Sequence, residues 1–180
     1  GVGKTAMMKA AFERAGLKAM YFSASTLDPW VDLIGAPKPI AVRGTKTKKA
    51  HDILGLVRPQ WVMDDDVDVI FFDELNRAPD KVLNAVMELI QFKSLNGHQL
   101  QKLKMVWGAI NPSGEEDGYM VTELDPAQRD RFQVQIKVPF DVDEDYFKTI
   151  HGSQLGKALV SWWNDLAADD KLLVSPRRLD

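Results

Sequence analysis

Hydrophobic residues fall into short continuous runs, separated by longer segments in which they recur every three or four positions. The run at residues 67–72 (VDVIFF) is almost entirely apolar and is followed by two acids. Similar runs occupy residues 18–23 (KAMYFS) and 104–110 (KMVWGAI). Strands buried on both faces of a parallel sheet have this pattern. The runs therefore predict parallel strands, with residues 67–72 forming the central one.

The segments between these runs carry helix signals. Residues 4–15 are rich in helix formers and are followed by Gly16, a natural C-cap. After Pro79, apolar side chains recur at helical spacing through residues 82–90. Residues 125–128 (DPAQ) combine an N-cap acid, a proline at the first helical position and a capping-box glutamine. Strands alternating with helices indicate an α/β fold.

Several shorter patterns predict further elements. Residues 96–97 (NG) are a hairpin signal, and residues 134–138 alternate as a strand does. Residues 28–30 (DPW) predict a short helical turn with proline at its first position. Residues 146–150 predict a short helix, and residues 155–166 predict an amphipathic helix whose two tryptophans form the core of a small helical subdomain.

Residues 35–59 show neither period and predict an exposed, mobile loop. Two prolines and a glycine interrupt the segment, at Pro37, Pro39 and Gly44. It also holds a basic run, consisting of Arg43, Lys46, Lys48 and Lys49. Because no aromatic residue is interleaved with these charges, a solvated loop is favoured over a surface that contacts a polymer or a substrate.

Composition narrows the possible classes. A chain of 180 residues with 45% apolar residues suits one domain, or one and a part. The net charge of −3 makes no electrostatic case for extensive nucleic-acid binding. The sequence has no cysteine, which excludes disulfides and zinc–thiolate sites, and its three histidines lack metal-ligand spacing. No apolar run is long enough to span a membrane.

Two acids, Asp73 and Glu74, follow the central apolar run. Open parallel sheets bind ligands beyond the carboxyl ends of their strands. One carboxylate there can hold Mg²⁺ and the other can accept a proton from water. The alternative is a solvated acidic strand end, and the two acids alone do not decide between these interpretations.

The first residues favour the catalytic interpretation. Gly3-Lys4-Thr5 match the last fixed positions of a P-loop, in which backbone N–H groups cradle phosphate, the lysine reaches the β- and γ-phosphates and the threonine hydroxyl contacts Mg²⁺. The first glycine of that motif and the strand before it would precede Gly1. We therefore expect the sequence to be a fragment that starts inside its phosphate-binding loop.

Three further positions are candidates for nucleotide chemistry. Asn111 follows the apolar run at 104–110, where an amide can orient a water or touch a terminal phosphate; the alternative is an Asn-Pro turn. Arg129 and Arg131 lie at the end of the short helix that begins at residue 125. Ser175-Pro176 again predicts a cap followed by proline, which places Arg177 and Arg178 in the first turn of a helix.

Together these segments resemble the AAA+ ATPases, and most closely their MoxR-like branch. GVGKT resembles the end of Walker A, and VIFFDELNRAP resembles Walker B with that branch's Asn-Arg-Ala-Pro continuation. VWGAINP is similar to sensor 1, LDPAQRDRF to the arginine-finger helix, and SPRR to the start of the sensor 2 helix. The matches run in family order from residue 1 to residue 178. Residues 33–59 resemble the insert that this branch places before Walker B.

The resemblance implies a fold and two cofactors. The fold is a P-loop NTPase core of the AAA+ type, in which helices sandwich a parallel sheet, with a truncated small helical lid. The core would occupy residues 1–139, without its N-terminal strand, and the partial lid residues 140–180. The implied cofactors are ATP and Mg²⁺, and the implied reaction is ATP hydrolysis.

The resemblance also implies residue roles. Thr5 and Asp73 would hold Mg²⁺, Glu74 would activate the attacking water, and Asn111 would be sensor 1. Arg131 would be the finger delivered to a neighbouring subunit's nucleotide, with Arg129 as the alternative. The nucleotide would be bound by the start of the chain and by sensor 2, namely Gly1, Val2, Gly3, Lys4, Thr5, Ala6 and Arg177. Arg178 is the alternative for sensor 2.

Members of this branch form homo-oligomeric rings, usually hexamers, and remodel protein clients, often with a partner that bears a von Willebrand A domain. The resemblance thus implies a cytoplasmic ring ATPase with a protein client and no membrane partner. Three alternatives stay open. A monomeric P-loop kinase would explain GKT but not the adjacent acids, and Glu74 argues against a nucleotide-binding subunit that does not hydrolyse. A DNA-directed motor is supported by the basic segment alone.

Overall fold

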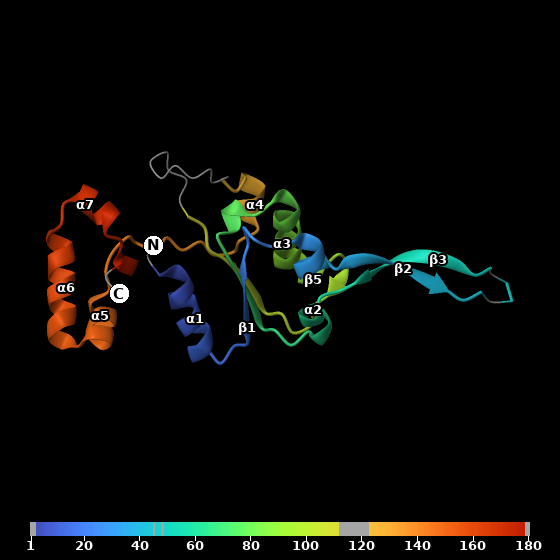
Figure 1. The fold of residues 1–180 in the computed structure, drawn as a ribbon, viewed down its shortest axis with the longest axis horizontal. Coiled ribbons are helices and arrows are strands. Elements are labelled where there is room, and N and C mark those ends of the chain that lie inside the picture. Colours follow the sequence, from blue (N-terminus) through green and yellow to red (C-terminus); the bar gives the residue numbers. More distant parts are fainter. Residues whose placement is uncertain (1–2, 45, 48, 112–122, 179–180) are drawn as a thin grey trace. The chain divides into compact units, whose positions relative to one another are not determined.

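The computed structural model describes residues 3–44, 46–47, 49–111 and 123–178 (Figure 1). The chain divides into two compact units. The sheet unit comprises residues 11–134, and the helical unit comprises residues 1–10 together with residues 135–180. Helix α1 (Lys4–Arg14) therefore begins in the helical unit and ends in the sheet unit.

The sheet unit is built on three parallel strands, in the order β1 (Ala19–Ser23), β4 (Val69–Asp73) and β7 (Met105–Gly108). The predicted central strand is the middle one, and its first four residues are at most 1% exposed. The register pairs Phe72 with Phe22 on one side and with Gly108 on the other. The parallel sheet and its flanking helices confirm the predicted α/β P-loop core.

Successive side chains of β4 pack on opposite faces of the sheet. On one face Phe71 lies edge-on to Phe12 of α1, with ring centroids 6.5 Å apart. On the other face Phe72 stacks on Phe22 at 5.6 Å and joins a cluster with the apolar side of α3 (Asp80–Phe92). Helix α2 (Gln60–Asp64) adds Trp61, which contacts Phe22. A strand covered on both faces needs no polar alternation, which explains its apolar sequence.

Asp68 ties together the amino ends of the three strands. Its carboxylate accepts hydrogen bonds from the backbone N–H of Lys18 at 2.9 Å and from Lys104 Nζ at 2.7 Å. The hydrogen bond from Lys104 is the largest cause that lowers the pKa of Asp68 below its usual value. Lys18 precedes β1 and Lys104 precedes β7. The bonds of Asp68 therefore align the amino-terminal ends of the three strands and support the observed register.

Several local predictions in the sheet unit are confirmed. The π-helical turn η1 (Pro29–Ile34) is capped by Asp28, whose carboxylate accepts from the N–H groups of Trp30 and Val31. A hairpin joins β5 (Ser94–Leu95) and β6 (His98–Gln99) through Asn96 and Gly97, both at positive φ, as its turn requires. Helix α4 (Pro126–Asp130) has the complete capping box that residues 125–128 predict.

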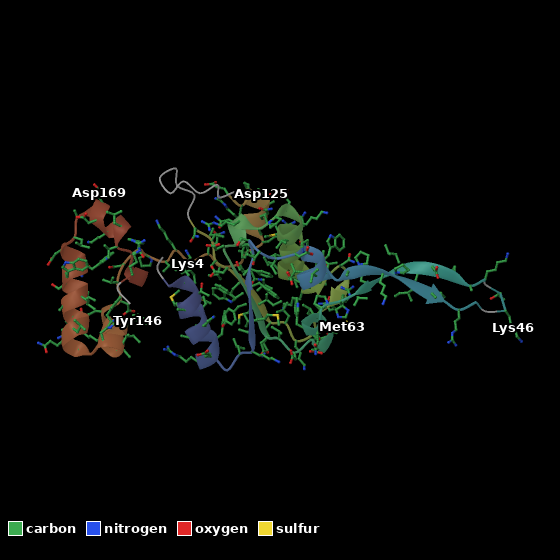
Figure 2. The ribbon with its side chains drawn as sticks, viewed as in Figure 1. Lys4, Lys46, Met63, Asp125, Tyr146 and Asp169 are labelled. Carbon is green, nitrogen blue, oxygen red and sulfur yellow. The ribbon has the colours of Figure 1, made fainter. Side chains whose placement is uncertain are left out.

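The prediction of a mobile loop at residues 35–59 is wrong. Strands β2 (Ala36–Val42) and β3 (His51–Val57) form an antiparallel hairpin that extends from the rest of the sheet unit, with Lys46 at its far end (Figures 1 and 2). Pro37 and Pro39 lie two residues apart, so both missing N–H groups can face the open edge of β2. The predicted exposure of this segment is confirmed, because most of its residues are exposed.

The strand predicted at residues 134–138 is also wrong. These residues, all of them described, pair with no strand. Val134 is 68% exposed and Ile136 is 65% exposed. Alternating apolar side chains form a strand where a neighbouring strand offers its hydrogen bonds and a surface to cover, and the described sheet ends at β1 and β7 without reaching this segment.

The helical unit contains α5 (Glu144–His151), α6 (Ser153–Asp165), α7 (Ala168–Leu173) and the turn η4 (Pro176–Arg178). α5 and α6 approach closely at Gly156, where a Cβ atom would lie 2.6 Å from the backbone of Phe147. Trp163 is 2% exposed and donates from Nε1 to the carbonyl of Val174 at 2.7 Å. The prediction of two core tryptophans is half right, because Trp162 is 50% exposed. No described helix is both long and apolar enough to cross a membrane.

The packing at Phe72 leads to a stability prediction. Phe72 is fully buried between Phe22 and α3. We expect Phe72→Ala to lower the free energy of unfolding by about 3–5 kcal/mol, because it removes apolar contacts and leaves a cavity. Urea unfolding followed by circular dichroism measures this change. Met63→Ala is the control, because Met63 is 60% exposed. Equal stability losses in the two variants would contradict the assignment of Phe72 to the core.

Candidate active site

The chain turns sharply where β4 ends. Asp73 is the last residue of β4, and its backbone carbonyl accepts from the N–H of Ala24 at 2.8 Å, which levels the ends of β1 and β4. Glu74 has φ 53° and ψ 41°, the left-handed region that few non-glycine residues occupy. Its N–H donates to Asp73 Oδ1 at 3.0 Å. Backbone strain of this kind occurs preferentially at functional sites.

The Glu74 carboxylate is held by the turn η2 (Leu75–Arg77). Glu74 Oε1 lies 3.1 Å from Arg77 Nη1. The two side chains are 35% and 27% exposed, so the carboxylate of Glu74 is both restrained and open to solvent. A base that activates water needs both properties, because it must be oriented and must reach the water that it deprotonates.

Asn111 lies at the same edge of the sheet as Asp73 and Glu74. The pairing of β4 with β7 continues past the strands, since the N–H of Ala109 donates to the carbonyl of Phe72 at 2.8 Å. Asn76 then bonds to the backbone of Asn111. The structure therefore brings Asp73, Glu74 and Asn111, all predicted from the sequence, to one edge of the sheet. The sequence predicts no separate role for Asn76 or Arg77, because residue type alone does not reveal burial or pairing.

Arg129 and Arg131 have different partners. Arg129 Nη2 lies 3.0 Å from Glu123 Oε2 in an exposed ion pair. Arg131 follows α4 as its C-cap and is exposed. It donates from Nε to Gln91 Oε1 at 3.3 Å and from Nη1 to the carbonyl of Ala127 at 3.2 Å. Both acceptors of Arg131 are neutral, so these contacts leave its charge uncompensated.

The predicted phosphate-binding residues begin α1. Gly1 and Val2 lie outside the described residues. Gly3 has φ 72°, and its carbonyl accepts from the N–H of Met7 at 2.9 Å, so α1 starts directly after it. Lys4 is the first residue of α1 (Figure 2). Lys4 and Thr5 are half-buried, and Ala6 beside them is exposed. A glycine leading into a helix N-terminus suits phosphate, because N–H groups there lack partners within the helix.

The predicted sensor 2 residues occupy η4, which confirms a helical turn after Ser175. Arg178 Nη1 donates to the carbonyl of Leu173 at 2.7 Å, so this side chain is engaged with α7. Lys4, Thr5 and Arg177 belong to the helical unit, whereas Asp73, Glu74, Asn111 and Arg131 belong to the sheet unit. A meeting of the two sets around one nucleotide is part of the proposal below.

The donor groups fit Mg²⁺ better than a transition metal. Taken separately, Thr5 of the helical unit carries a hydroxyl and Asp73 of the sheet unit carries a carboxylate, and both are hard oxygen ligands. Among the described residues, no group of three or more His, Cys, Asp or Glu side chains could hold a metal ion. Mg²⁺ at nucleotide sites needs no such cage, because phosphates and water supply most of its ligands.

Comparison with known proteins agrees with this chemistry. The ATPase family associated with various cellular activities (AAA) matches residues 1–140. Similar solved structures include a candidate ATPase from Cytophaga hutchinsonii ATCC 33406, with 24% identity and a TM-score of 0.44 over 74% of this chain. The chain spans 37% of that protein's length. No curated protein matches the chain. Because the family match covers most of the chain, the chain belongs to the AAA family of ATPases.

Proposed function

We propose that the chain binds ATP with Mg²⁺ and hydrolyses it as a subunit of a MoxR-like ring that remodels a protein client. The observation that carries the hydrolysis is the placement of Asp73, Glu74 and Asn111 at one edge of the sheet. Membership of the AAA family supports ATP-dependent activity and ring assembly. The Asn-Arg-Ala-Pro continuation after Glu74 and the insert at residues 33–59 support the MoxR-like branch.

In this proposal the P-loop end and the strand ends share one nucleotide. Lys4 would bind the β- and γ-phosphates, and Thr5 and Asp73 would hold the metal. Mg²⁺ supplies charge neutralisation on the phosphate oxygens. The Glu74 carboxylate takes a proton from water, and the Asn111 amide orients that water or the terminal phosphate. The α/β core corresponds to residues 1–139 and the helical lid to residues 140–180.

The arginines complete the site across and within subunits. Arg131 acts on a neighbouring subunit's nucleotide, which is supported by its exposure and by its neutral partners. Arg129 is the weaker candidate, because Glu123 already compensates its charge. Arg177 contacts the nucleotide of its own subunit, and the bond from Arg178 to Leu173 favours Arg177 over Arg178. The ring is a hexamer, with a protein client and a von Willebrand A-domain partner.

Phosphate release, measured against subunit concentration with and without duplex DNA, tests this function in the natural full-length protein. We expect turnover per subunit to rise as rings assemble and to be independent of DNA. Turnover without any concentration dependence would support a monomeric enzyme. Absence of turnover would support a nucleotide-binding subunit.

A DNA-directed motor is the second candidate, because the projecting hairpin β2–β3 carries a basic tip. Between its two strands the sequence holds Arg43, Lys46, Lys48 and Lys49, called the tip residues here, of which Lys48 lies outside the described residues. Duplex DNA that stimulates wild-type turnover in proportion to its concentration would favour this candidate over a protein client.

Neutralising the hairpin tip tests what the hairpin contacts. We expect replacement of the four basic residues by serine to leave basal ATP turnover unchanged, because the tip lies at the far end of β2–β3 from the sheet (Figure 2). Stimulation by an unfolded model protein should be lost, if the tip engages the client. The control replaces Lys102 and Lys137, two basic residues outside the hairpin. Unchanged stimulation in the tip variant would show that the basic residues of the hairpin do not contact the client.

A further inference from the structure

Asn76 is a buried polar residue at the turn that follows the two acids. It is 4% exposed and lies in η2, where the chain has already left the sheet. Among the described residues, Asn76 and Ser94 are the two buried polar side chains. Burying an amide is costly unless all its groups are hydrogen-bonded, so the partners of Asn76 indicate what the residue does.

Both ends of the Asn76 amide bind the backbone of one residue, Asn111. Asn76 Nδ2 donates to the Asn111 carbonyl at 2.8 Å, and the Asn111 N–H donates to Asn76 Oδ1 at 3.3 Å. A carboxamide offers one donor side and one acceptor side, as a peptide group does. Asn76 therefore takes the place of a strand residue beside Asn111.

The bonds of Asn76 extend a series that begins in the sheet. The N–H of Ala109 donates to the carbonyl of Phe72 at 2.8 Å, and the N–H of Leu75 donates to the carbonyl of Ala109 at 2.9 Å. β4 turns away at Glu74, and after the Leu75 bond it is the side chain of Asn76 that bonds to the backbone of the chain following β7. The Asn76 side chain extends the pairing from Ala109 to Asn111. It thereby holds the Asn111 backbone at the same edge of the sheet as Asp73 and Glu74.

We propose that Asn76 is a positioning residue for ATP hydrolysis, which holds Asn111 in register with Glu74. The proposal rests on the function proposed above. Asn76 acts through the backbone of Asn111 and so determines where the Asn111 amide lies relative to the water that Glu74 activates. Small displacements at a reacting centre can cost about 10²-fold in rate. No other common side chain makes both bonds at this length: aspartate lacks the donor, and glutamine is one methylene longer.

A double-mutant cycle on kcat tests this role in the natural full-length protein, with Asn76→Ala, Asn111→Ala and the double variant. We expect Asn76→Ala to lower kcat by about 10- to 100-fold with little change in KM for ATP. If Asn76 acts through Asn111, the double variant should be as active as Asn111→Ala, because the positioned group is already absent. A merely structural Asn76 would instead lower activity by the same factor in both backgrounds.

Ser94→Ala is the matched control. Ser94 is 7% exposed, and its hydroxyl donates to Glu88 Oε1 at 2.8 Å, so its loss also removes a buried hydrogen bond. We expect this variant to lose thermal stability but keep its kcat. If Asn76→Ala does not fold, Asn76→Asp replaces it in the test. Aspartate keeps the shape and the acceptor of asparagine but lacks the donor, so we expect the kcat of Asn76→Asp to fall as well.

The possible results distinguish failure of the positioning role of Asn76 from failure of the proposed ATPase function. Wild-type kcat in both Asn76 variants, or equal losses in the two backgrounds, would overturn the positioning role alone. A comparable loss of kcat in Ser94→Ala would do the same, because instability would then explain the effect. Wild-type turnover by a Glu74→Gln variant would overturn the proposed function, and the positioning role with it.

Discussion

We expect Glu74→Gln to bind ATP and Mg²⁺ as the wild type does but to hydrolyse ATP about 10²- to 10⁴-fold more slowly. Glutamine keeps the size of the side chain and can still accept a hydrogen bond from Arg77, which lies 3.1 Å from Glu74 Oε1. It lacks the carboxylate that accepts a proton from the attacking water. Phosphate release at saturating ATP measures the rate, and a fluorescent ATP analogue measures the affinity.

Two controls separate the base from other effects of charge. Glu144→Gln makes the same change in the helical unit, where Glu144 pairs with Lys148 at 2.5 Å, and should leave turnover unchanged. Asp73→Asn should weaken binding of the Mg²⁺ complex itself, because Asp73 is assigned to the metal. If Glu74→Gln hydrolyses ATP at the wild-type rate, Glu74 is not the base that activates the attacking water.

The second large effect is expected at Arg131. If its guanidinium stabilises charge on a neighbouring subunit's transferring phosphoryl group, Arg131→Ala should lose about 10³- to 10⁵-fold in turnover. If Arg131 merely bonds Gln91 and Ala127 on the surface, its loss should cost about 1 kcal/mol or less of stability and no turnover. Arg129→Ala is the comparison, because Arg129 is the alternative finger: a larger loss of turnover in Arg129→Ala than in Arg131→Ala would transfer the role to Arg129.

A mixing experiment decides whether Arg131 acts between subunits. Arg131→Ala and Glu74→Gln subunits should each be nearly inactive alone. In mixed rings, some interfaces pair an intact Glu74 with an intact Arg131 donated by its neighbour, so part of the activity should return. If mixed rings form and stay inactive, or if Arg131→Ala alone is active, the role between subunits is wrong and Arg129 becomes the next candidate.

Patterns with a local cause were predicted correctly. The capping box at residues 125–128 and the hairpin turn at Asn96-Gly97 need only a few adjacent residues to be stable. The strand β4 was recognisable because a strand covered on both faces carries apolar residues at successive positions. The acids at its end, Asp73 and the following Glu74, indicated a site, because the fold class predicts ligands at that edge.

Segments whose structure depends on pairing with a second segment were predicted incorrectly. Residues 35–59 contain prolines and were predicted to be a loop, yet β2 pairs with β3 with Pro37 and Pro39 within β2. Residues 134–138 alternate like a strand, yet no described strand pairs with them and their side chains stay exposed. Strand pairing is a property of two segments, so neither segment alone determines it.

The sequence by itself determined the α/β class, the central strand and the acids Asp73 and Glu74, because these follow from periodicity and from motifs of adjacent residues. The tertiary structure decided how the end of β4 is held beside Asn111. Asn76 and Asn111 lie 35 residues apart, and their two hydrogen bonds form because β4 and β7 are neighbours in the sheet. Burial then makes both bonds obligatory, since an asparagine 4% exposed has little water to replace them.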